Sequence, residues 1–161
     1  MSKIDYPVTS AIRFLRAHQI EFKPCLYPYI ERGGTAHSAE CLGVPEHQVI
    51  KTIVLQNEHK QGLIVLMFGD KYISTRNLAR ELGMKHIEPA DLKQANKWTG
   101  FLVGGTSPFG TKTSLPVYVE AGVWDLEKIY INAGKRGFLV AVVPASLKSL
   151  NPQTVNVATD V

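Results

Sequence analysis

The chain has 161 residues, of which 45% are hydrophobic and 20% are charged. These values are typical of one globular domain that buries a core and argue against a disordered chain. Eighteen Lys and Arg residues against fourteen Asp and Glu give a formal net charge of +4, which permits a nucleic-acid partner without requiring one. No apolar run approaches the roughly 18 residues of a membrane-spanning helix, and the first residues lack the apolar stretch of a secretion signal. We therefore expect a cytoplasmic protein without a membrane partner.

The two cysteines, Cys25 and Cys41, are widely separated in the sequence. They form no CxxC pair and have no histidine partner at the spacing of a metal site. The pattern therefore predicts no metal site, and in a reducing compartment both thiols are expected to be free.

Helical and strand-like segments alternate along the first half of the chain. In chain order they are a helix over Val8–His18, a strand over Glu21–Tyr29, a helix over Thr35–Leu42, and strands over Gln48–Gln56 and Gly62–Phe68. Pro24 and Pro28 interrupt the first strand, which places it at a sheet edge because proline cannot donate to a ladder. The polar turn 57–61 predicts that the last two strands form a hairpin. Thr9 or Ser10 and Thr35 are the expected N-caps of the two helices.

The second half continues the alternation. Its predicted elements are helices over Ser74–Leu82 and Pro89–Asn96, strands over Phe101–Val103, Val117–Glu120, Lys128–Asn132 and Phe138–Val143, and a helical turn after Pro144. No repeat or long linker divides the chain. The mixture predicts a single α/β domain over residues 1–161, with a mixed β-sheet surrounded by helices.

A glycine-rich segment, Gly104–Gly110, follows the predicted strand at Phe101–Val103. Glycines allow a ligand to approach the backbone closely, and successive N–H groups can hold an oxyanion, a carbonyl oxygen or a phosphate. Thr106 and Ser107 add hydroxyl groups. The alternative interpretation is a plain hairpin loop.

Two basic positions are further candidates. Lys51 lies between apolar residues in a predicted strand, where it either faces solvent or holds a phosphate, carbonyl or carboxylate near a pocket. The segment Asn132–Gly137 places Lys135 and Arg136 between two glycines, as a solvated hairpin tip or as a phosphate clamp. The cations that could extend such a surface are Arg32, Lys71, Arg76 and Lys112.

Three segments occur in a specific order: Val49–Thr52, Gly100–Gly110 and Ile129–Gly137. With this order and spacing the chain resembles the YbaK/EbsC family of aminoacyl-tRNA deacylases, also called the prolyl-tRNA synthetase-associated editing domain. The resemblance extends from about Val8 to about Leu150. It implies that family's fold, with a mixed and partly barrel-like sheet, and no cofactor.

The resemblance also implies roles for individual residues. It implies that Lys51 is the key active-site residue and that the backbone of the segment from Gly104 to Pro108 holds the aminoacyl ester. The predicted catalytic residues are Lys51, Gly104 and Gly105. The predicted substrate-binding residues are Tyr27, Thr52, Thr106, Ser107, Pro108, Asn132, Gly134, Lys135 and Arg136.

Three positions depart from the family pattern. Asn132 stands where the YbaK branch typically has serine, Leu139 where it has aspartate, and Pro28–Arg32 where it has an acidic stretch. These positions shape the aminoacyl pocket in the family, so they bear on amino-acid specificity more than on the reaction.

The activity that the resemblance implies is removal of a small mischarged amino acid, Cys first and then Ala or Ser, from tRNA for proline. The partners would be a mischarged tRNA and a prolyl-tRNA synthetase. An aminoacyl ester is already activated, so the enzyme mainly positions it and stabilises an oxyanion. We expect Lys51 to orient the ester, while water, a tRNA hydroxyl or the substrate's own thiol attacks. In the cysteine branch of the family, thiol attack gives a thiolactone.

Two other classes of function compete with this one. The first is a non-catalytic module of the same fold that binds tRNA or a synthetase. The second, a DNA-binding regulator, is disfavoured because no two-helix motif with a basic recognition helix is present.

Overall fold

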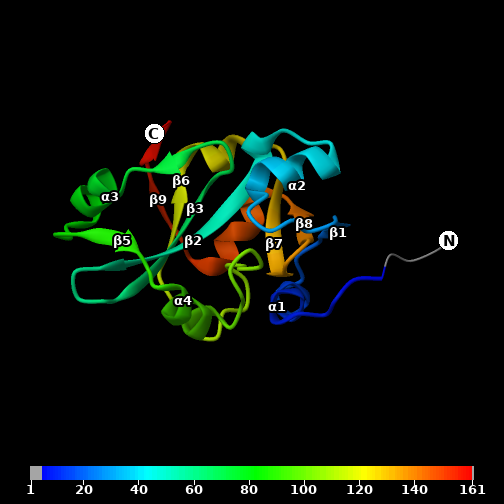
Figure 1. Cartoon of the computed structure of the whole chain (residues 1–161), viewed down its shortest axis with the longest axis horizontal. Helices are drawn as coiled ribbons and strands as arrows, with labels where there is room; N and C mark the ends of the chain where they lie inside the picture. Colours follow the sequence, from blue (N-terminus) through cyan, green and yellow to red (C-terminus); the bar gives the residue numbers. More distant parts are fainter. Residues whose placement is uncertain (1–4, 161) are drawn as a thin grey trace.

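The computed structural model describes residues 5–160 (Figure 1). The first four residues, part of the segment considered for a secretion signal, lie outside this range. The helices are α1 (Ser10–Ala17), α2 (Gly34–Leu42), α3 (Thr75–Leu82) and α4 (Leu92–Thr99), with short 3-10 helices η1 (Glu46–Gln48), η2 (Ala121–Asp125) and η3 (Pro144–Leu150). The strands are β1 (Lys23–Leu26), β2 (Val49–Asn57), β3 (Gly62–Phe68), β4 (Tyr72–Ile73), β5 (Ile87–Pro89), β6 (Val117–Glu120), β7 (Ile129–Lys135), β8 (Phe138–Val142), β9 (Gln153–Val155) and β10 (Ala158–Thr159).

One mixed sheet dominates the molecule. Its strand order is β1-β8-β7-β2-β3-β6-β9, and β5 pairs with β2 outside this path. The pairs β2–β7, β3–β6 and β6–β9 are parallel, whereas the other pairs of this sheet are antiparallel. Strands β4 and β10 form a separate two-stranded sheet. The predicted mixed sheet, the β2–β3 hairpin and the edge position of β1 are confirmed. The sheet path has two ends, so the expected barrel-like character does not extend to a closed barrel.

Helices α1 and α2 pack against opposite faces of this sheet. Ile50 belongs to the large core cluster together with Ile12 and Leu15 of α1. The adjacent Val49 instead packs in a second cluster with Ala39 of α2. Successive side chains of a strand point to opposite faces, so Lys51 follows Val49 onto the face that α2 covers.

The predicted helix ends are largely confirmed. Thr9 caps α1, and its side chain accepts a hydrogen bond from the Ile12 N–H. Helix α2 ends at Gly43, whose left-handed φ of +68° suits glycine. Thr35 is not the N-cap of α2, because Gly33 holds that position. The Thr35 hydroxyl instead lies 2.7 Å from the Glu46 carboxylate and 3.0 Å from the Gly69 carbonyl oxygen.

The predicted strand at Phe101–Val103 is wrong. Leu102 and Val103 are 61% and 47% exposed, and the Gly105 N–H closes a turn onto the Leu102 carbonyl at 2.8 Å. Apolar residues therefore gave a strand-like pattern in a segment that contributes Phe101 to the core and turns directly afterwards.

The prediction of a helix over Pro89–Asn96 needs correction at its start. Pro89 ends β5 and is opposite Leu55 of β2, so helix α4 begins only at Leu92. Strands β4, β5, β9 and β10 were not predicted, because each has only two or three residues and shows no alternation.

The thiols and the helix lengths can be stated for residues 5–160. Cys25 and Cys41 are free thiols, as expected. No helix there combines the length and hydropathy that spanning a bilayer requires.

Candidate active site

The sheet is split beside β2, and a pocket opens at the split. One edge of β2 pairs with β3 from Ile50 to Gln56. On the other edge, β7 pairs only at Val49 and Ile50, and β5 pairs only from Leu55 onward. Within residues 5–160, positions 51–54 therefore have no strand partner on that edge. A pocket of about 490 Å³ lies there, between β2, the β7–β8 hairpin, the glycine loop and the segment that leads into α2.

The pocket brings together residues predicted from distant parts of the sequence. The predicted residues that line it are Tyr27, Lys51, Thr52, Gly104, Thr106, Asn132 and Arg136. Those that do not line it are Gly105, Ser107, Pro108, Gly134 and Lys135.

Lys51 is half-buried on the wall formed by β2. Its Nζ donates a hydrogen bond to the Lys71 carbonyl oxygen and lies 4.9 Å from the centre of the Tyr72 ring. Burial lowers the pKa of Lys51, and the carboxylates of Glu46 and Asp70 partly oppose this effect. Lys51 lines the pocket, whereas Lys71 and Tyr72, which hold its partly dehydrated ammonium group, do not belong to the lining.

Thr52, the next residue, carries the one buried side-chain oxygen within residues 5–160 that has no hydrogen-bond partner. An unsatisfied buried hydroxyl costs about 1–3 kcal/mol.

The glycine loop is fastened to the β7–β8 hairpin through its carbonyl groups. Arg136 Nε donates to the Val103 carbonyl at 2.8 Å, and Asn132 Nδ2 donates to the Gly104 carbonyl at 3.1 Å. The C=O and N–H of a trans peptide point in opposite directions, so the Gly104 N–H is directed away from Arg136. The Gly105 N–H is already used in the turn to Leu102.

Close packing explains the two glycines at the start of the loop. A Cβ on Gly104 would lie 2.8 Å from the Tyr29 hydroxyl, and one on Gly105 would lie 2.8 Å from the Arg136 backbone nitrogen. The Arg136 guanidinium also covers the Tyr29 ring, at 5.4 Å from the ring centre. Tyr29, Gly104 and Arg136 thus form one packed wall of the pocket.

The predicted residues outside the pocket support its shape. Ser107 is fully buried, and its hydroxyl accepts a hydrogen bond from the Phe109 N–H at 3.1 Å. The Gly134 N–H donates to Asn132 Oδ1 at 2.8 Å, inside a β-bulge of β7. Lys135 is exposed beside a neighbouring groove of about 470 Å³, which shares Tyr27 and Arg136 with the pocket.

Some residues that line the pocket were not among the site residues predicted from the sequence. His37 lines the pocket from α2. Its Nε2 lies 2.7 Å from the Pro28 carbonyl oxygen and 3.5 Å from the Cys41 sulfur. The spacing of His37 and Cys41 by four residues could have indicated that the two side chains are neighbours on one face of a helix. Glu31, which contributes the one carboxylate of the lining, lies in the segment Pro28–Arg32 that the resemblance placed at the aminoacyl pocket.

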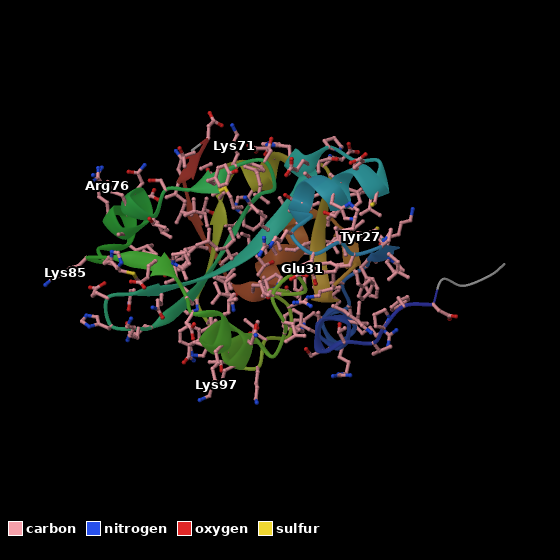
Figure 2. All side chains as sticks on the ribbon, viewed as in Figure 1. Tyr27, Glu31, Lys71, Arg76, Lys85 and Lys97 are labelled. Carbon is pink, nitrogen blue, oxygen red and sulfur yellow. The ribbon has the colours of Figure 1, made fainter. Side chains whose placement is uncertain are left out.

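The basic residues do not form one surface. Arg32 and Arg136 line the pocket. Arg76 and Lys85 lie at the opposite end of the molecule, formed by α3 and β5, away from Tyr27 and Glu31 (Figure 2). Within residues 5–160, no group of three or more His, Cys, Asp or Glu side chains is arranged to hold a metal ion.

Solved structures show the same fold. The hypothetical protein APE2540 superposes with a TM-score of 0.85 at 18% identity, over 94% of this chain and 100% of that one. A candidate trans-editing enzyme for prolyl tRNA synthetase gives a TM-score of 0.80 at 22% identity, over 93% and 97% of the two chains.

Sequence relatives identify the family. EbsC of Enterococcus faecalis, a candidate Cys-tRNA(Pro)/Cys-tRNA(Cys) deacylase, is 29% identical over 153 residues, which are 94% of this chain and 93% of EbsC. A proline–tRNA ligase of Streptococcus equi is 30% identical over 100 residues, which are 62% of this chain and 16% of the ligase. The family model of the aminoacyl-tRNA editing domain matches residues 33–150. The chain therefore belongs to the aminoacyl-tRNA editing domain family.

Proposed function

We propose that the chain is a trans-editing aminoacyl-tRNA deacylase. It cleaves the ester between a small mischarged amino acid and the 3′ end of tRNA for proline, with Cys as the first candidate and Ala and Ser next. The observation that carries the proposal is the pocket at the split in the sheet. There Lys51, the glycine loop and the β7–β8 hairpin meet from three distant parts of the chain.

The relatives support this class of substrate. EbsC, which matches over nearly its whole length, is named for deacylation of cysteine from tRNA. The match to a proline–tRNA ligase connects the same domain to tRNA for proline. A prolyl-tRNA synthetase is accordingly the protein partner we propose, and the cytoplasm is the proposed location.

Each group in the pocket has a task in ester cleavage. Lys51 holds the ester by its carbonyl oxygen or by the phosphate of the terminal adenosine. The N–H groups of Gly104 and Thr106 stabilise the oxyanion that develops on the carbonyl. The Thr52 hydroxyl, buried without a partner, hydrogen-bonds to the bound ester. None of these groups acts as a nucleophile.

With a cysteinyl ester, the substrate can supply the attacking group itself. The deprotonated thiol attacks its own carbonyl carbon, and a sulfur–carbon bond forms. The ester oxygen leaves with the tRNA and takes up a proton as the free 3′-hydroxyl. The products are a cyclic thiolactone and uncharged tRNA, without consumption of water. Alanyl and seryl esters would need water or a tRNA hydroxyl as the attacking group.

Part of the pocket wall is apolar and suits an apolar or thiol side chain. Val49, Ile50 and Leu139 line the pocket and are nearly fully buried. Leu139 offers no hydrogen bond to a serine hydroxyl, and leaving such a group unpaired is unfavourable. Two substrates that differ by one or two methylene groups are discriminated in an apolar pocket by only about 1–3 kcal/mol. We therefore rank Cys and Ala above Ser.

The test is deacylation of Cys-, Ala- and Ser-tRNA(Pro) by the purified chain, with correctly charged Pro-tRNA(Pro) as the control. Lys51→Ala should abolish the loss of the preferred ester. Lys51→Arg keeps the charge but changes its geometry, and we expect it to lose most of the activity. Mass spectrometry of the released product separates a thiolactone from free cysteine.

Survival of all three esters at high enzyme concentration would rule out these substrates. Binding of tRNA or synthetase without cleavage would then identify a non-catalytic module. Full activity of Lys51→Arg would show that the lysine's own geometry is not required.

A further inference from the structure

We propose that the C-terminal strand β10 is a positioning element for Lys51. Residues 151–160 lie beyond the segment that matches the family model, which ends at residue 150. The inference rests on the proposed role of Lys51 in the pocket, and it concerns what keeps that side chain in place.

Two groups hold the Lys51 ammonium, and both come from the start of β4. The Lys71 carbonyl oxygen accepts a hydrogen bond from Nζ, and the Tyr72 ring lies 4.9 Å away. Tyr72 is 59% exposed, so burial of its own surface contributes little to fixing the ring. The position of both groups therefore depends on how the backbone of β4 is held.

Strand β10 is what pairs with β4. Tyr72 is opposite Thr159, and Ile73 is opposite Ala158. The pairing continues at Ser74, whose N–H donates to the Val157 carbonyl oxygen at 2.8 Å. The Lys71 ammonium also forms an ion pair with Asp160. The Lys71 N–H also closes a turn onto the Phe68 carbonyl oxygen at 3.2 Å. Since β4 is not a strand of the main sheet, the β10 contacts are what hold the strand that follows this turn.

The C-terminal segment is anchored in the core. Glu120, at the end of β6, is 3% exposed. Its Oε1 accepts hydrogen bonds from the N–H groups of Val157 and Ala158, at 2.7 Å and 3.1 Å. The Val157 side chain is itself 1% exposed. A continuous path of contacts thus leads from β6 through the C-terminal segment and β4 to the Lys51 ammonium.

Other charges near Lys51 are independent of β10. The carboxylates of Glu46 and Asp70 favour its ammonium form, and Asp70 is also paired with His47 at 2.8 Å. These groups lie before β4 in the sequence. Loss of β10 therefore acts through the Lys71 carbonyl and the Tyr72 ring. Water that enters from that side relieves the burial that lowers the pKa of Lys51.

The experiment compares three changes with the unaltered chain. A chain that ends at Val157 removes β10 but keeps the Val157 contacts with Glu120 and Ser74. Tyr72→Leu removes only the ring, and Asp160→Asn removes only the ion pair. Glu127→Gln is the control, because it neutralises an exposed carboxylate distant in sequence from β4 and β10.

Four quantities are measured for each variant. They are the melting temperature, kcat and KM on Cys-tRNA(Pro), and the pKa of Lys51 from the pH dependence of its acetylation, read by mass spectrometry. We expect kcat to fall about tenfold without β10 and about threefold to tenfold in Tyr72→Leu, with KM changed less than twofold. The pKa of Lys51 should rise toward that of a free lysine in the chain without β10, where water reaches the ammonium group. It should fall in Tyr72→Leu, because the ring that stabilises the ammonium form is removed. In Asp160→Asn, kcat should fall about twofold.

An unchanged kcat together with an unchanged pKa of Lys51 in a folded chain without β10 would overturn the proposal. If that chain does not fold, the same two quantities in Tyr72→Leu decide. If the unaltered chain cleaves no ester, the proposed function fails, whereas the acetylation measurement still decides whether β10 positions Lys51.

Discussion

At the scale of single residues, Thr52 has the most direct consequence for stability. Its hydroxyl is buried without a partner, so the free protein carries the cost of an unsatisfied polar group. In the proposed role of Thr52, hydrogen bonding to the bound ester relieves that cost. In this role the unpaired hydroxyl lowers the stability of the empty protein and raises its affinity for the ester. The two quantities can therefore be separated by one isosteric substitution.

We predict that Thr52→Val raises the free energy of unfolding by about 1 kcal/mol, because a methyl group replaces an unsatisfied hydroxyl. The same change should lower kcat/KM for the preferred ester about tenfold, since a hydrogen bond to the substrate is lost. Urea denaturation and steady-state kinetics measure the two effects.

Thr99→Val is the matched control for this substitution. The Thr99 hydroxyl is also buried, but it donates to the Ala95 carbonyl at 2.9 Å and accepts from the Phe101 N–H at 3.1 Å. Its loss should destabilise the protein by about 1–2 kcal/mol. The same sign of the stability change in both variants would contradict our account of Thr52.

At the scale of elements, Asn132 joins the glycine loop to the β7–β8 hairpin. Its Nδ2 donates to the Gly104 carbonyl, while its Oδ1 accepts from the Gly134 N–H. Asn132→Asp keeps the acceptor, replaces the donor by a second acceptor oxygen and, at pH 7, adds a negative charge. We predict a 10- to 100-fold loss of kcat/KM at pH 7, because the loop that holds the oxyanion is released, with a nearly unchanged melting temperature.

The pH dependence of this variant provides a second measurement. A protonated carboxyl group donates a hydrogen bond again, and the ordinary pKa of aspartate is about 3.9. The rate of Asn132→Asp relative to the unaltered chain should therefore recover as the pH falls toward 4. A constant ratio across the pH range would show that the donor to Gly104 is not what the substitution removed. Asn77→Asp, on the exposed face of α3, is the control.

The elements that the sequence predicted are those whose signals are local. Caps and terminal glycines located α1 and α3, and the apolar run of β3 with its polar turn located the β2–β3 hairpin. The prediction of a strand over Phe101–Val103 was wrong because apolar residues are equally compatible with a strand and with an exposed turn. Only tertiary structure shows that Leu102 and Val103 remain outside the core.

The site was predictable to the extent that its residues carry a recognisable order. Lys51, the glycine loop and the hairpin were found in this way. The segment Pro28–Arg32, with Glu31, was placed at the pocket by the resemblance alone. His37 was not found, because its position depends on how α2 packs over the sheet. The unpaired hydroxyl of Thr52 depends on burial, which the sequence does not specify for one threonine.

At the scale of the whole molecule, the net charge of +4 bears on the proposed tRNA binding, which we expect to be sensitive to salt. Arg32 and Arg136 line the pocket and Lys135 lies beside it, which allows about three phosphate contacts. With a slope of about 0.7 per contact for single strands, affinity should fall on the order of tenfold between 50 and 200 mM salt.

Fluorescence anisotropy with labelled tRNA measures this slope. Lys135→Gln should reduce it by about 0.7. Lys97→Gln, on α4 away from Tyr27 and Glu31 (Figure 2), should leave it unchanged. Equal effects of the two substitutions would place the phosphate contacts elsewhere on the surface.

The split beside β2 also has a consequence for aggregation. Exposed strand edges invite pairing with other chains, and positions 51–53 have no strand partner on one edge in the middle of the sheet. At position 54 the carbonyl oxygen already accepts a hydrogen bond from the Ala90 N–H. Strands β7 and β5 close this edge at both ends, so a long strand from a second molecule finds no room to align. The opening admits only a short ligand, and the fold can keep backbone groups available for binding without a risk of polymerisation at this edge.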